Sequence, residues 1–244
     1  MKHETPDCFK AHPLYLPCTA CCEVRAGQFR FLTGIALFWL AVLLLFPGAG
    51  RASGAYSSLY VFSDSVSTTT TTSNTPSSLF YGRRYCNGRV WVEVLAEQQG
   101  IPFSDAKNLS FFGHYSQVLL SKINNFTAPD AQTSLFVVWV CDADFVDMLA
   151  EVPIPPSGSY TTNQHLASWT TLINQSLTNH ALAIQMLYEK GARALVMPNA
   201  VDISKTPYYR MSPANNSFFF DRVITFNAGL AAVLQNAQAS FPDL

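Results

Sequence analysis

Residues 134–140 read SLFVVWV, an uninterrupted apolar run rich in β-branched and aromatic residues. A run of this kind is typical of a strand that is buried on both faces of a parallel sheet. Two further runs, LYVF at 59–62 and ARALVM at 192–197, predict two more strands, and we expect the second of them to be buried as well. Together the three runs define the expected sheet.

Stretches with helical spacing of apolar residues separate these runs. The stretch 90–99 stops at Gly100 and a following proline, and a long helical pattern stops at Gly191, both of which are C-terminal signals. Residues 63–78 are mostly Ser and Thr and predict a surface loop. The alternation of strands and helices predicts an α/β fold, a three-layer sandwich with a mainly parallel sheet. The expected helices are 90–99, 115–126, 163–190 and 221–239.

Composition excludes several classes of protein. The chain has 244 residues, of which 49% are hydrophobic and 13% charged, and this excludes a disordered chain or a coiled coil. The formal net charge is -1, so no basic field is present to bind a phosphate backbone. We therefore expect no nucleic-acid partner, and function has to be sought in local motifs.

The amino-terminal part predicts export. Residues 31–46 (FLTGIALFWLAVLLLF) carry no charge, follow Arg25 and Arg30, and precede small residues. This order is typical of a signal peptide, with cleavage after Ala52 or after Gly54. An uncut signal anchor is the alternative, although the run is shorter than the about 20 residues of a membrane span. We expect a leader over 1–54, a domain over 55–244, and a secreted or periplasmic protein.

Cysteine usage agrees with this division. Four of the six cysteines precede the apolar run, and no second Cys or His pair follows them at the distance of a zinc site, so they predict leader sequence and no metal. Only Cys86 and Cys141 remain in the domain. Two separate buried thiols are the expected state, and a disulfide bond between them is the alternative that export would permit.

Ligands bind at the carboxyl ends of the strands in open α/β sheets, so the residues after each strand matter most. The first strand runs into FSDSVS at 62–67, which puts a serine in a tight turn where its hydroxyl can face a cleft. This stretch resembles the first block of the GDSL (SGNH) hydrolases, in which the serine after Asp is the nucleophile. The resemblance gives that role to Ser65, while Ser63 replaces the family's glycine.

Three other segments extend the resemblance over most of residues 56–240. YGRRYCNGRVWVE at 81–93 is similar to the family's stretch after the nucleophile loop, and VMPNAVDISKTP at 196–207 is similar to a later one. NLSFFGH at 108–114 resembles the second block, in which a glycine N–H helps to form the oxyanion hole. The resemblance gives this role to Gly113, with Phe112 in place of the preceding glycine.

The third block departs from the family. The pattern Trp-x-Gly-x-Asn-Asp is replaced by WVCDAD at 139–144, with Cys141 for the glycine and Ala143 for the asparagine. That asparagine donates to the oxyanion in the family, and loss of such a donor typically costs about 100- to 1000-fold in rate. We expect that Asp142 cannot replace it, because an ionised carboxylate has no proton to donate.

The general base is also missing. In the family it comes from a late Asp-x-x-His block, but no histidine follows His180 here, and the chain stops at Leu244. We therefore expect a partial domain that lacks its last strand and helix. His114 is the one histidine beside the predicted site. It is either a recruited base or a packed or solvated side chain, and we expect His165 and His180, which lie in a helical stretch, to be packed or solvated side chains.

Two hypotheses follow. The first is an exported GDSL-type hydrolase that cleaves acyl or acetyl esters of lipids or carbohydrates through Ser65, with Gly113 and the Ser65 backbone as oxyanion donors. The second is an inactive truncated paralogue, or a ligand-binding module of the same fold. The resemblance implies neither a cofactor nor a metal, and it implies a membrane contact only through an uncut leader.

Overall fold

Three parallel strands form the sheet, in the order β1 (Leu59–Ser63), β2 (Leu135–Trp139), β3 (Leu195–Val196). The register pairs Leu59 with Leu135 and Ser63 with Trp139, so β1 and β2 end side by side. An extended segment lies on the other side of β1, where Asn108 bridges to Val61 in parallel. All three predicted strands are therefore present, with their carboxyl ends at one edge.

The computed structural model describes residues 55–70, 81–156 and 161–244. The described residues belong to one structural unit, Arg51–Leu244. The predicted leader over 1–54 lies outside them. The signal peptide, and the assignment of four cysteines to leader sequence, therefore stay predictions.

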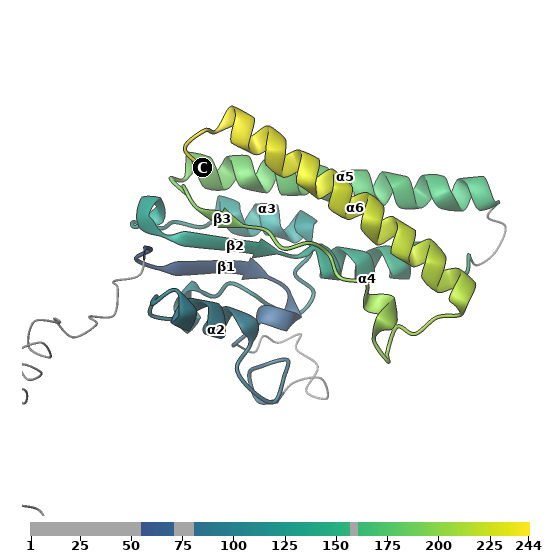
Figure 1. The fold of residues 1–244 in the computed structure, drawn as a ribbon, viewed down its shortest axis with the longest axis horizontal. Coiled ribbons are helices and arrows are strands. Elements are labelled where there is room, and N and C mark those ends of the chain that lie inside the picture. Colours follow the sequence, from purple (N-terminus) through teal and green to yellow (C-terminus); the bar gives the residue numbers. More distant parts are fainter. Residues whose placement is uncertain (1–54, 71–80, 157–160) are drawn as a thin grey trace, which may run out of the picture. The chain divides into compact units, whose positions relative to one another are not determined.

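Each face of the sheet has its own hydrophobic core, because side chains alternate along the strands. Tyr60 and Phe62 of β1 pack into the larger core, whereas Leu59 and Val61 point into a smaller one. Helix α2 (Trp91–Gln98) covers the smaller core, and Figure 1 shows it on the opposite side of the sheet from α3 and α5. The larger core contains residues of α3 (Ser116–Asn124), α4 (Cys141–Glu151), α5 (Thr162–Glu189) and α6 (Pro213–Ser240). The predicted three-layer α/β architecture is confirmed.

The predicted helices form, with two differences. The stretch 141–151 was expected only to carry a motif, yet it forms α4, with Asp142 and Asp144 in its first turn and Phe145 and Met148 facing the core. The last helix was predicted from 221 but begins at Pro213, because Ser212 caps it and a proline is well suited to a first helical position.

Two predictions about burial were wrong. The run 192–197 shortens to the two residues of β3, and Val196 is exposed, because β3 pairs with β2 on one side only. The Ser/Thr tract does not begin as a surface loop: Ser67, Thr68 and Thr69 are fully buried. The hydroxyls of Thr68 and Thr69 and the carbonyl oxygen of Ser67 bond to the 108–110 segment, and the Ser67 hydroxyl bonds to Ser63 and Trp91, so their burial is tolerated. Residues 71–80 of the tract lie outside the described residues.

Candidate active site

Ser65 opens a short 3-10 helix, η1 (Ser65–Ser67), directly after the end of β1. The side chain of Asp64 caps this turn, since its Oδ1 accepts a hydrogen bond from the backbone N–H of Val66 at 3.0 Å. Asp64 is buried and Ser65 is half-buried. The serine hydroxyl therefore belongs to a capped turn at the carboxyl end of β1.

A chain of hydrogen bonds holds this turn. Trp91 Nε1 donates to Ser67 Oγ at 2.8 Å, Ser67 Oγ lies 2.6 Å from Ser63 Oγ, and Ser63 Oγ donates to the carbonyl oxygen of Trp139 at 2.7 Å. Because Ser63 donates to Trp139, the proton between the two serines comes from Ser67. Ser63 thus links η1 to β2 and, through Ser67, to α2.

The 108–114 segment brings Gly113 to the same end of β1. The backbone N–H of Phe111 in this segment donates to the carbonyl oxygen of Ser63 at 3.2 Å. Asn108 Nδ2 donates to the carbonyl oxygen of Ser67 at 2.9 Å. Gly113 has φ +78°, a left-handed conformation that favours glycine, and no heavy atom lies within 4 Å of the position of a Cβ. Gly113 is exposed. Its role as an oxyanion donor stays a prediction.

His114 is packed, as one of the two expectations for it required. Its Nδ1 lies 3.0 Å from the carbonyl oxygen of Ser63, which can only accept, so Nδ1 carries the proton. The ring stacks on Phe111 with centroids 4.2 Å apart, and its Nε2 is buried without a hydrogen-bond partner among the described residues. Burial lowers the pKa of His114 to about 4, so its imidazole is neutral at pH 7. An unused lone pair is present, but it is weakly basic.

His165 and His180 are packed within α5, as expected. His165 Nε2 lies 3.0 Å from the carbonyl oxygen of Pro153, and His180 Nδ1 lies 2.8 Å from that of Ser176. Both contacts require a ring N–H that donates.

Three buried aspartates join the segments around Ser65. Asp64 Oδ2 accepts from the backbone N–H of Ala143 at 3.2 Å, and Asp142 Oδ1 accepts from that of Val201 at 2.9 Å. Asp144 accepts from the backbone N–H of Ser116 at 2.7 Å. The carboxylates thus tie β1, α4, the loop after β3 and the start of α3 together. The sequence motif did not predict this function of the third block.

The buried carboxyls titrate far from their ordinary range. Burial, with the nearby charge of Asp142, raises the pKa of Asp64 to about 7. Burial, with the charge of Asp144, raises the pKa of Asp142 to about 6, and burial also raises the pKa of Asp144. The expectation that Asp142 cannot donate concerns its ionised form, which is the main form above about pH 6.

The most specific sequence match, 81–93, includes a structural clamp. Arg84 makes a two-point contact with Glu93, with Nε 2.7 Å from Oε2 and Nη2 2.5 Å from Oε1. The same carboxylate accepts from the backbone N–H of Val90 at the start of α2. The clamp fixes the loop that precedes Trp91 and its bond to the η1 turn.

The two cysteines of the domain are free thiols, and the disulfide alternative is not observed; the expected burial is found for Cys141 and is wrong for Cys86. Cys141 is buried and burial raises the pKa of its thiol, whereas Cys86 is only half-buried and lies 3.3 Å from the carbonyl oxygen of Gly88. Among the described residues no group of three or more His, Cys, Asp or Glu side chains is arranged to hold a metal ion.

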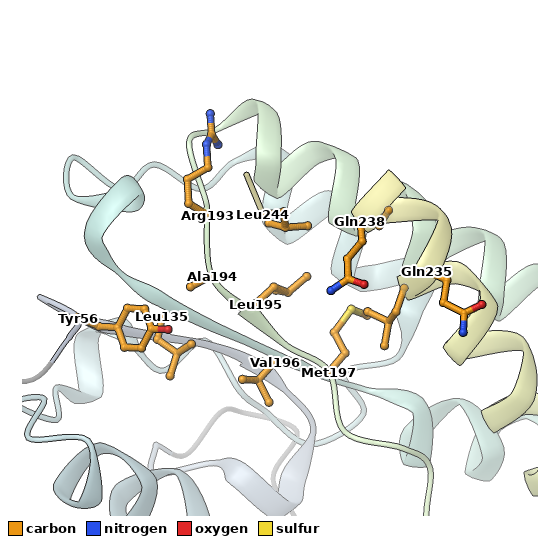
Figure 2. A pocket seen from close by; sticks show the side chains of 12 residues that line it. Tyr56, Leu135, Arg193, Ala194, Leu195, Val196, Met197, Gln235, Gln238 and Leu244 are labelled. Atoms are coloured by element: carbon orange, nitrogen blue, oxygen red, sulfur yellow. The ribbon is translucent and has the colours of Figure 1, made fainter. Parts of the chain in front are cut away.

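A hollow of about 440 Å³ lies away from the predicted site, beside β3 and the end of α6. Figure 2 shows Leu195 of β3, Met197 just after it, and Gln235 and Gln238 of α6 around the hollow. Neither Ser65 nor Gly113 lines it.

No protein-family model matches the sequence, and no curated protein sequence matches it. Among solved structures, the chain is similar to phospholipase A1 from Streptomyces albidoflavus NA297, with a TM-score of 0.43 and 15% identity over 78% of this chain and 77% of that one.

Proposed function

We propose that the chain is an exported GDSL-type hydrolase that cleaves acyl or acetyl esters through Ser65, and that its turnover at neutral pH is low. The observation that carries the proposal is the position of Ser65, in a capped turn at the carboxyl end of β1 beside the 108–114 loop. Open α/β sheets place their active sites at this edge. The motifs at 62–67, 81–93, 108–114 and 196–207 supply the family and the ester substrate.

In the proposed reaction Ser65 Oγ attacks the acyl carbon of the ester and releases the alcohol, and water then hydrolyses the acyl-enzyme. The backbone N–H groups of Ser65 and Gly113 would stabilise the oxyanion. The neutral Nε2 of His114 would take the serine proton and pass it to the ester oxygen that leaves as the alcohol. Because the pKa of His114 is lowered to about 4, this transfer is unfavourable, and slow turnover is expected.

A catalytically inactive ligand-binding module is the second candidate. The observation that favours it is the acidic surrounding of Ser65, since Asp64 and Asp142 are ionised above about pH 7 and would repel an oxyanion. The N–H of Ala143, in the first turn of α4, is already bonded to Asp64.

Covalent labelling distinguishes the two candidates. The full chain is treated with a fluorophosphonate probe, and hydrolysis of p-nitrophenyl acetate is measured in parallel. The hydrolase predicts slow turnover and a label on Ser65, both lost in Ser65→Ala and retained in Ser121→Ala, a serine exposed on α3. Equal rates in wild type and Ser65→Ala, with no label on Ser65, would leave the binding module.

Export is a separate part of the proposal. The full chain, expressed in a secreting host, is expected to appear in the medium with its new amino terminus at Ser53 or Ala55. Retention in the membrane fraction with residues 31–46 intact would instead support the uncut anchor.

A further inference from the structure

The position of Ser65 is set by hydrogen bonds of its neighbours in the chain. The side chains of Ser63, Asp64 and Ser67 each bond to a different element, namely β2, α4 and α2. The backbone carbonyl oxygen of Ser65 also accepts from the N–H of Thr68 at 3.2 Å, which closes the turn. The direction in which the Ser65 hydroxyl points therefore depends on how firmly the turn around it is held.

The bond to α2 differs from the others because it belongs to a closed network. The hydrogen bonds run from the indole of Trp91 to Ser67, from Ser67 to Ser63, and from Ser63 to the carbonyl oxygen of Trp139. The ring of Trp139 packs nearly at right angles to that of Trp91, with centroids 5.4 Å apart and an angle of 82° between the planes. These four residues form the indole–serine network, which joins α2, η1, β1 and β2.

All hydrogen bonds of the indole–serine network point the same way. The indole N–H of Trp91 can only donate and the carbonyl oxygen of Trp139 can only accept, so each hydroxyl between them accepts from one side and donates to the other. Ser63 and Ser67 are fully buried. Hydrogen bonds in such a buried chain polarise and strengthen one another. Loss of the indole donor should therefore loosen the turn as well as remove one bond.

Trp91 is itself held by contacts that do not involve the turn. It is the first residue of α2, and the preceding Val90 is buried in the smaller core. The backbone N–H of Val90 donates to Oε2 of Glu93 at 2.8 Å, and Arg84 clamps that carboxylate. The network thus connects the turn to a fixed helix start. Its members bond to or pack on one another, so residues 63–139 are sufficient to form it.

We propose that Trp91 is a positioning residue for Ser65, and that its hydrogen bond to Ser67 keeps Ser65 Oγ directed at the acyl carbon of the ester. This inference rests on the proposed hydrolase function. Trp91 contacts neither the substrate nor the reacting atoms in this role, because it acts through Ser67. A displacement of about 1 Å at a reacting group can cost about 100-fold in rate, so a loosened turn should slow the attack.

The other tryptophan of the described helices illustrates a purely structural role. Trp169 on α5 is fully buried, and its Nε1 donates to the carbonyl oxygen of Val152 at 3.1 Å. Val152 lies at the carboxyl end of α4, whereas the contact with Asp64 is made by Ala143 in the first turn. Substitution of Trp169 by Phe therefore removes an equivalent indole donor and leaves the bonds of the turn in place.

Steady-state kinetics of the full chain test the proposal, with the rate of Ser65→Ala subtracted. Turnover of p-nitrophenyl acetate is slow, so KM equals the dissociation constant of the ester, and a loss of positioning should lower kcat alone. Trp91→Phe is expected to lower kcat, and the rate at which a fluorophosphonate labels Ser65, about 10-fold or more, with KM changed less than about 2-fold. Trp169→Phe is expected to melt at a lower temperature but to keep the wild-type kcat.

A double-mutant cycle tests whether Trp91 acts through Ser67. Ser67→Ala should lower kcat as Trp91→Phe does, and the double variant should lose no more than either single variant, because all three break the same chain. If Trp91→Phe does not fold, as judged by circular dichroism, Ser67→Ala against Trp169→Phe still decides the question.

Four results would contradict this inference. A wild-type kcat in Trp91→Phe or in Ser67→Ala would overturn it, and so would losses that multiply in the double variant. A raised KM with unchanged kcat would instead show that Trp91 contacts the substrate. A wild type that is neither labelled at Ser65 nor active would overturn the proposed hydrolase and this inference with it, whereas the other three results leave the hydrolase standing.

Discussion

The backbone N–H of Ala143 donates a hydrogen bond of 3.2 Å to Oδ2 of Asp64, and so joins the first turn of α4 to the residue before Ser65. A helix amino terminus favours negative charge, and here it holds a carboxylate of the protein itself. In the resemblance to the GDSL hydrolases, Ala143 stands where that family has its oxyanion-binding asparagine. In this structure its backbone N–H forms an internal link to Asp64.

The stability of the domain should respond to the titration of Asp64. Its pKa is about 7 in the folded protein and about 3.9 in an unfolded chain, so the folded state binds the proton more tightly. Its contribution to the free energy of unfolding is present below about pH 4 and is lost as the pH rises through 7. Asp64→Asn removes this loss and keeps an acceptor for Val66. The free energy of unfolding of the variant minus that of the wild type should therefore increase between pH 4.5 and pH 8, by an amount on the order of 1–4 kcal/mol.

Urea unfolding at several pH values measures this difference, and Asp221→Asn, on the exposed side of α6, is the control. His114 acts in the opposite sense: its pKa is lowered to about 4, so stability falls as the pH drops from 6.5 to 4. The wild type and Asp64→Asn share this effect of His114, so it cancels in the difference between their free energies of unfolding. Parallel curves for wild type and Asp64→Asn would show that Asp64 does not titrate in this range.

Restoring the family's asparagine tests the damaged third block. Ala143 is half-buried in the first turn of α4, and Ala143→Asn adds an amide donor there. If Ser65 is the nucleophile, ester hydrolysis should rise about 10-fold or more, less than the full value of such a donor because the base stays weak. Ala150→Asn, exposed on the same helix, should leave the rate unchanged. A rate unchanged by both substitutions would contradict the proposed oxyanion site.

The fold could be predicted from the sequence because burial leaves a periodic signal. The run around Val137 and the long pattern around Trp169 each match one element. Helix α4 was missed although Asp142 and Asp144, which favour a helix amino terminus, precede Phe145 and Met148 at helical spacing. A strand near Leu195 was predicted, but its length of two residues was not, because the length of a strand depends on which neighbouring strands pair with it.

The site was less predictable, because its chemistry depends on contacts between distant segments. Ser65 and Gly113 follow from the resemblance, and both lie at the carboxyl end of β1. However, the hydrogen bond between Trp91 and Ser67 and the pKa of Asp64 depend on burial and on partners far away in the chain. No local pattern of residues specifies such partners.

Asn108 should be important for stability. It is 6% exposed, and its amide donates to the carbonyl oxygen of Ser67 at 2.9 Å and to Thr69 Oγ1 at 3.0 Å. Asn108→Ala leaves these buried acceptors without their donor, and we expect a loss of about 2–3 kcal/mol in the free energy of unfolding. Asn124→Ala, at an exposed position of α3, should change it by less than about 0.5 kcal/mol. Similar losses in both variants would indicate that the Asn108 bonds do not hold the turn.

The two thiols of the domain should react at different rates. Cys141 is 1% exposed, and burial raises the pKa of its thiol, so little reactive thiolate is present, whereas Cys86 is half-buried. Iodoacetamide is therefore expected to modify Cys86 in the native protein and Cys141 only after unfolding in urea. Peptide mapping by mass spectrometry assigns each site separately, so the leader cysteines do not interfere. A native sample without reducing agent that yields a peptide linked through Cys86 and Cys141 would contradict the free-thiol structure and restore the disulfide alternative.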